Sequence, residues 1–293
     1  MTPAHNLIKS VAEKIPLPEV YHSIKGLVVT PDAKIEDFVE VINRDPALAT
    51  RIIRMANSQF FGYSRKARTV EQAISLIGVI QLHDLLLSSL AIRAFSGIPM
   101  DVINQEAFWR SCIYCGIIAR LLAKKYMLPA SERLFTSGLL HEIGHIVMYA
   151  KIPEQTQDVL IESQENSKPL YQVEREKIGF DYGQVGSEIM QLWHLPENYC
   201  DIARYHMEPE KAENNKVEII LVNLARSIML SGEGNLQNTD NAILYKQNKL
   251  IKQKLTAQEI EVIKKSAELY IDDVMDCLWP FSRNVAEESI ILL

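Results

Sequence analysis

Two histidines and a glutamate stand together in the string His141-Glu142-Ile143-Gly144-His145. On a helix, this H-E-x-x-H spacing would place both imidazoles one turn apart on a zinc ion, with Glu142 as the general base of a metalloprotease. The extended form of the pattern needs a glycine at position 148 and a histidine at position 151, where this chain has Met148 and Lys151. A downstream glutamate could be the third ligand instead, but no motif surrounds any of the candidates, which are Glu162, Glu174 and Glu188. The lack of an identified third ligand argues against a zinc metalloprotease.

Core packing is a second interpretation of the same histidines. Residues 134–149 are apolar on most faces of the helix that they predict, and a lone histidine in such a helix is usually a core residue with one hydrogen-bonded nitrogen. Gly144 inside this helix costs about 1 kcal/mol relative to alanine, so we expect it to let another helix approach closely. Neither feature requires catalysis.

Secondary-structure elements must position these groups. Along almost the whole chain, the apolar residues recur with the period of an α-helix. Asp45-Pro46 predicts an N-cap followed by the first residue of a helix, and Thr69-Val-Glu-Gln72 is a capping box that opens another. Ser131 predicts the N-cap of a helix that continues through Ala150. No alternating strand pattern of convincing length is present. We therefore predict an all-α, multi-helical fold.

Changes of composition divide the chain into three predicted segments. Residues 1–98 form an N-terminal helical lobe that ends at a Ser-Gly-Ile-Pro break, and residues 99–231 form a second helical lobe. Residues 232–293 begin with a polar, Asn-rich loop and end with an amphipathic helix over 257–277. That last helix could pack on the second lobe or on another subunit, and a homodimer is compatible with it.

Composition bounds the partners and the location. The chain has 293 residues, 47% of them hydrophobic, and a net charge of −6 without any block of like charge. Duplex DNA and anionic membranes are not expected as partners, because neither would meet a basic face. No apolar stretch approaches the roughly 20 residues needed to cross a bilayer, and no apolar signal core is present, so we expect a cytoplasmic protein.

Four cysteines do not space like a disulfide framework. Cys112 and Cys115 form a C-x-x-C, but no second pair and no strand-to-helix turn accompanies it. Their spacing places two small hydrophobic residues on one face of a predicted helix. We predict that they pack in the core and do not bind a metal.

Several strings, in a fixed order, resemble the HDOD (HD-related output domain) family, a bacterial signalling module of the HD superfamily. The resemblance covers residues 15–226 and rests mainly on the Asp-Pro to Ala-Asn-Ser element at 45–58, followed at a distance by Gly138-Leu-Leu-His141. The other strings that carry it are Leu17-Pro18, Ala73-Ile74, Phe108-Trp109, Gly179, Val185-Gly186, Trp193-His-Leu-Pro196 and His206. The resemblance implies an HD-like helical fold.

The resemblance also implies where a metal centre would lie. Phosphohydrolases of the superfamily hold one or two divalent metals with an upstream histidine, a His-Asp doublet and a distant aspartate, and these metals lower the pKa of a bridging water. The corresponding residues of this chain are Ser111, His141, Glu142, Tyr182, His206 and Arg226.

This set implies a degenerate metal site. Ser111 replaces the upstream histidine, Tyr182 and Tyr205-His206 stand where further histidines are frequent, and Glu142 lengthens the usual aspartate by one methylene. Arg226 places a cation where the distant aspartate is expected. We therefore expect no catalytic residue, no metal and no other cofactor. We also predict that Arg226 pairs with Glu142 in place of the metal, and that His145 is a bystander.

Two functions are compatible with these residues. The first is a non-catalytic signal-transduction module that acts through protein–protein interaction, whose partners are other, unidentified signalling proteins. The alternative is a divergent phosphohydrolase acting on a nucleotide or phosphoester, with a divalent metal on His141, Glu142 and His206.

Overall fold

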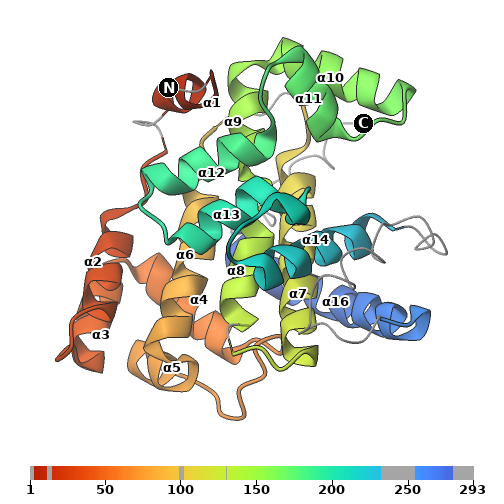
Figure 1. Cartoon of the computed structure of the whole chain (residues 1–293). Coiled ribbons are helices and arrows are strands. Elements are labelled where there is room, and N and C mark those ends of the chain that lie inside the picture. The colour runs from red at the N-terminus through yellow and green to blue at the C-terminus, as the bar shows by residue number, and fades with distance from the viewer. Residues whose placement is uncertain (1–2, 12–14, 99–101, 130, 232–254, 280–293) are drawn as a thin grey trace, which may run out of the picture. The chain divides into compact units, whose positions relative to one another are not determined.

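The computed structural model describes residues 3–11, 15–98, 102–129, 131–231 and 255–279. Within these ranges the regular structure is helical and contains no strand, which confirms the predicted all-α class (Figure 1). The predicted loop at 231–248 lies almost wholly outside the described residues.

The chain divides into two compact units. Unit 1 combines Met1–Pro16 with Phe95–Lys265, and unit 2 combines Leu17–Ala94 with Ser266–Leu293. Helix α16 (Ala257–Leu278) begins in unit 1 and ends in unit 2. These units join stretches that are separate in sequence, whereas the predicted segments 1–98, 99–231 and 232–293 are consecutive. The segment boundaries stay predictions.

Unit 2 is built from short helices whose ends follow the capping residues. Asp45 accepts a hydrogen bond from Leu48 N at 3.0 Å, and Thr69 accepts one from Gln72 N at 3.2 Å, so both predicted N-caps are confirmed. Besides its part of α16, the unit contains α2 (Glu19–Val28), α3 (Ile35–Asn43), α4 (Pro46–Asn57), α5 (Val70–Ile77) and α6 (Val79–Phe95), the last of which ends at the first residue of unit 1.

Unit 1 holds the sequence-predicted site residues. Its central pair is α7 (Gln105–Lys125) and α8 (Ser131–Leu140). A Cβ added at Gly138 would lie only 2.8 Å from the Cα of Gly116, so glycine at these positions lets the two helices approach closely. The described elements of the unit, besides the start of α16, are α1 (Pro3–Lys9), α7 (Gln105–Lys125), α8 (Ser131–Leu140), α9 (Ile143–Lys151), α10 (Pro153–Glu165), α11 (Leu170–Lys177), α12 (Tyr182–Leu192), α13 (Glu197–Tyr205), the 3-10 turn η2 (Pro209–Lys211) and α14 (Lys216–Leu230).

The prediction of one helix from Ser131 through Ala150 is wrong, because the chain turns at His141-Glu142 between α8 and α9. The imidazole of His141 donates from Nδ1 to the Gly138 carbonyl at 2.6 Å, and so satisfies one of the last carbonyls of α8. Glu142 then becomes the N-cap of α9. The two histidines of the H-E-x-x-H string therefore do not share one helix.

No single helix among the described residues has both the length and the apolarity to cross a membrane. Helices α5 and α6 meet these criteria only when joined, and the chain bends by 110° between them.

Candidate functional site

Five of the six predicted site residues lie in one buried cluster of unit 1. His141 and Glu142 occupy the turn between α8 and α9, Tyr182 is the first residue of α12, His206 follows α13, and Arg226 lies on α14. The sixth, Ser111 on α7, donates its hydroxyl to the sulfur of Met229 at 3.3 Å, one turn beyond Arg226 on α14.

Glu142 and Arg226 form the ion pair predicted from the sequence. Arg226 Nε donates to Glu142 Oε1 at 2.9 Å, and the two side chains are 28% and 14% exposed. Burial raises the pKa of the Glu142 carboxyl, but His141 and then Arg226 hold it well below its usual range. The carboxylate is therefore ionised at neutral pH and has a cation beside it.

His141 is buried and has one nitrogen that could still bind a ligand. With Nδ1 bonded to Gly138 O, Nε2 lies 3.5 Å from Glu142 Oε1 and has no hydrogen-bond partner within the described part of the chain. Burial lowers the pKa of His141, while Cys115 and Glu142 beside it raise the pKa, and the balance is a raised value.

His206 is a neutral imidazole whose two nitrogens are both bonded. Its Nδ1 donates to Ala203 O at 2.9 Å, so Nε2 is the acceptor for the Tyr182 hydroxyl at 3.2 Å. Burial lowers the pKa of His206 well below its usual value, and the positive charges of His141 and Arg226 lower it further. The rings of His141 and His206 meet edge to face, with centroids 4.9 Å apart.

These residues do not fit the divalent metal that the resemblance implies. The one carboxylate of the set is paired with Arg226, and a guanidinium would repel a dication at the same place. The Nε2 lone pair of His206 accepts the Tyr182 hydroxyl, which leaves His141 Nε2 as the remaining nitrogen of the set. The raised pKa of His141 keeps a proton on that nitrogen, and a metal could bind there only after the proton is lost. One nitrogen is fewer than the three protein ligands that a catalytic metal site needs.

Two neighbours of the cluster, Cys115 and Glu174, were not assigned to it from the sequence. Cys115 lies one turn beyond Ser111 on α7, and this spacing was the signal that could have placed it beside His141. Glu174 accepts from Tyr182 N at 3.0 Å, and its other carboxylate oxygen lies 3.4 Å from His145 Nε2. No motif surrounds Glu174, so only the tertiary structure reveals it.

His145 has a packing role next to the site. Its ring stacks on Tyr182 with centroids 3.8 Å apart and on Tyr149 with centroids 5.2 Å apart. His145 therefore contacts Tyr182, whose hydroxyl donates to His206 Nε2, and it is not an isolated bystander.

Gly144 explains how Tyr182 reaches the cluster. A Cβ at Gly144 would lie 1.9 Å from Tyr182 O and 2.7 Å from Gly186 N, so α9 and α12 are in backbone contact there. This confirms the predicted close approach of a second helix, and it excludes any side chain larger than hydrogen at the position.

Comparison with known proteins identifies a family and a fold. The model of the HDOD domain matches residues 15–209. A curated relative, an uncharacterized protein of Treponema pallidum (strain Nichols), is 26% identical over 253 residues, which cover 83% of this chain and 48% of the relative. The chain thus spans about half the length of that protein.

Solved structures share the fold. The HDOD domain protein of unknown function from Geobacter sulfurreducens superposes with a TM-score of 0.73 at 19% identity, over 94% of this chain and 98% of its own. A protein from Shewanella amazonensis SB2B named "Putative phosphohydrolase" gives 0.70 at 20% identity, over 92% and 96%. One from Marinobacter aquaeolei VT8 named "Putative signal transduction protein" gives 0.68 at 22% identity, over 92% and 60%. At such identities the likeness shows the fold alone.

Proposed function

The chain belongs to the HDOD domain family, and from that premise we propose that it is a non-catalytic regulatory module that binds other signalling proteins through an HD-type helical scaffold. The observation that carries the proposal is the ion pair between Arg226 and Glu142, two residues that the family resemblance assigns to the metal centre. One relative in fold carries a signal-transduction name, which agrees with this role.

The chemistry of the pair supports a scaffold without turnover. A metal-dependent phosphohydrolase must lower the pKa of a bound water and bind the phosphate oxygens, and both tasks need a dication on several anionic or neutral donors. Arg226 neutralises the carboxylate but cannot activate water, because its guanidinium has no open coordination position and accepts no proton at neutral pH. In this proposal the protein acts by binding partner proteins on the surfaces of its helices.

One observation favours the alternative, a divergent phosphohydrolase. The Nε2 atom of His141 is buried without a hydrogen-bond partner among the described residues, and after losing its proton it could bind a metal. One relative in fold carries the name "Putative phosphohydrolase". An assay that compares the native protein with a variant at His141 can therefore distinguish the two functions.

The assay is hydrolysis of a panel of phosphomonoesters and cyclic nucleotides, with Mn²⁺, Fe²⁺, Mg²⁺ or Zn²⁺ added in turn. We expect the native protein and the His141→Ala variant to give the same background rate with every substrate. Turnover by the native protein that disappears in the variant would overturn the proposal and establish the phosphohydrolase.

A further inference from the structure

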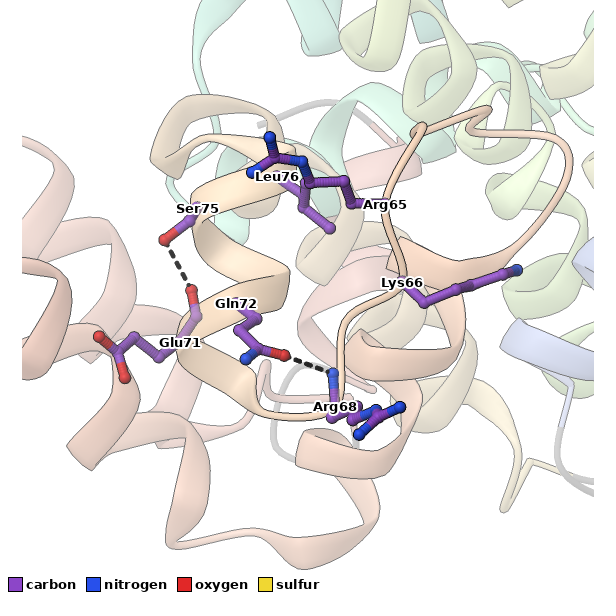
Figure 2. Close-up of a pocket in the computed structure, with 7 residues that line it drawn as sticks. All are labelled: Arg65, Lys66, Arg68, Glu71, Gln72, Ser75 and Leu76. Carbon is purple, nitrogen blue, oxygen red and sulfur yellow. Dashed lines mark hydrogen bonds between the residues drawn. The ribbon is translucent and has the colours of Figure 1, made fainter.

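A hollow of about 610 Å³ opens in unit 2 between the loop before α5 and the helix itself (Figure 2). Arg65, Lys66 and Arg68 line it from the loop, and Glu71, Gln72 and Leu76 line it from α5. We refer to this hollow as the basic pocket. All of its lining residues belong to unit 2, whereas the cluster around His141 belongs to unit 1.

The basic pocket has a charge opposite to that of the whole chain. Three cations occur within four consecutive positions of a chain whose net charge is −6. All three side chains are exposed, and no ion pair of the described residues involves Arg65 or Arg68. Lys66 Nζ donates to the Asn57 carbonyl at 2.8 Å, which leaves its charge without a carboxylate there. Glu71 is the one acid of the lining, and Figure 2 shows it directed away from Arg65 and Lys66.

The loop that carries these cations is held in place. The side-chain amide of Asn57 accepts from Ala67 N and donates to Ala67 O, both at 2.8 Å. Arg68 N donates to Gln72 Oε1 at 2.8 Å, and Ala67 itself is buried. The backbone therefore needs no ordering when a ligand arrives, and this lowers the entropic cost of binding.

We propose that the basic pocket binds an acidic segment of a partner protein. This inference rests on the proposed function and identifies the surface on which a partner would bind. Carboxylates of such a segment would face Arg65 and Arg68, where arginine forks match carboxylate geometry. The half-buried Leu76 in the wall would contact an apolar residue of the same segment. Nucleic acid fits less well, because its phosphate backbone would extend beyond these three cations on a chain whose net charge is −6.

The test is fluorescence anisotropy of a labelled peptide of Glu, Asp and Leu residues added to the full chain, with a Gln/Asn/Leu peptide as its uncharged match. We expect the acidic peptide alone to bind, and the affinity to fall as salt is added. The Arg65→Gln/Arg68→Gln variant should bind about tenfold more weakly, since two rim charges together contribute on the order of 1.4 kcal/mol. The Lys34→Gln/Arg44→Gln variant removes two exposed cations elsewhere in unit 2, and its affinity should stay within about twofold.

Equal affinity of the native protein and the Arg65→Gln/Arg68→Gln variant would overturn the basic pocket as the site, as would no binding of the acidic peptide. Tighter binding of a single-stranded oligonucleotide, or of vesicles containing anionic lipid, would overturn the assignment of the partner. None of these outcomes concerns catalysis. Conversely, hydrolysis that depends on His141 would refute the proposed function while leaving the peptide result in place.

Discussion

At the scale of single residues, Glu142 depends on His141 and Arg226 for its charge balance. Both side chains are less than one third exposed, so a lone carboxylate there would be poorly hydrated. We expect Arg226→Met to lower the free energy of unfolding by about 2 kcal/mol, less than for a fully buried pair. Adding Glu142→Gln to that variant should restore most of the loss, because it removes the uncompensated charge. Urea unfolding of the four proteins measures this cycle, and an unchanged single variant would contradict it.

A second residue-scale prediction concerns acid. Arg120 is 2% exposed and its guanidinium donates to Glu132 Oε1 at 3.0 Å, while the Ser131 hydroxyl donates to Oε2 at 2.7 Å. Burial raises the pKa of Glu132, but these two partners more than offset it, and the pKa is lowered. As the pH falls, the unfolded chain therefore takes up a proton at this glutamate before the folded chain does.

The stabilisation from Glu132 should thus be complete above the unfolded pKa of about 4.3 and should disappear as the pH falls through the lower folded pKa. We predict that Glu132→Gln reduces the pH dependence of stability below about pH 4.5, measured by unfolding at a series of pH values. Glu261→Gln is the control, since Glu261 and its partner Lys265 are 58% and 69% exposed. Equal acid slopes for native protein and Glu132→Gln would contradict the prediction.

At the scale of elements, the contact between α9 and α12 depends on a missing side chain. A methyl group at Gly144 would meet the backbone of Tyr182 and Gly186, which cannot move aside as a flexible side chain could. We expect Gly144→Ala to destabilise the protein by about 3 kcal/mol or more, the upper range for overpacking. Gly26 in α2 has nothing within 4 Å of an added Cβ, so Gly26→Ala should be neutral or stabilising by up to about 1 kcal/mol. Thermal unfolding compares the two variants, and similar melting temperatures for Gly144→Ala and Gly26→Ala would contradict the close contact.

The elements also show what local sequence patterns can predict. The starts of α4 and α5 follow from Asp45 and Thr69, because an N-cap is a contact between residues three apart. The break between α8 and α9 was missed, because apolar residues continue through it and a histidine side chain is not a common helix terminator. The position of Glu174 against Tyr182 and His145 was missed as well, since it depends on packing between helices that no motif marks.

At the scale of the whole molecule, the compact units join distant parts of the chain. Within unit 2, Asp273 on α16 accepts from Ser58 Oγ at 2.6 Å and from Gln59 N at 3.0 Å, more than 200 positions away. A contact of that separation leaves no local pattern, which is why the amphipathic helix at 257–277 could be predicted while its packing stayed open. The family resemblance supplied what periodicity could not: the pairing of Arg226 with Glu142, which the structure confirms.

The ion pair between Glu142 and Arg226 lies where the family resemblance implies a metal centre, and we propose that it takes the place of the metal. Metal content of the native protein, purified without chelator and then incubated with Mn²⁺, tests this replacement most directly, by elemental analysis after desalting. The variant Ser111→His/Arg226→Asp, which supplies an imidazole and a carboxylate at the two altered positions, serves as the positive control and should gain metal. We predict far less than one metal ion per native chain. One or two bound ions per native chain, lost on His141→Ala, would contradict the claim.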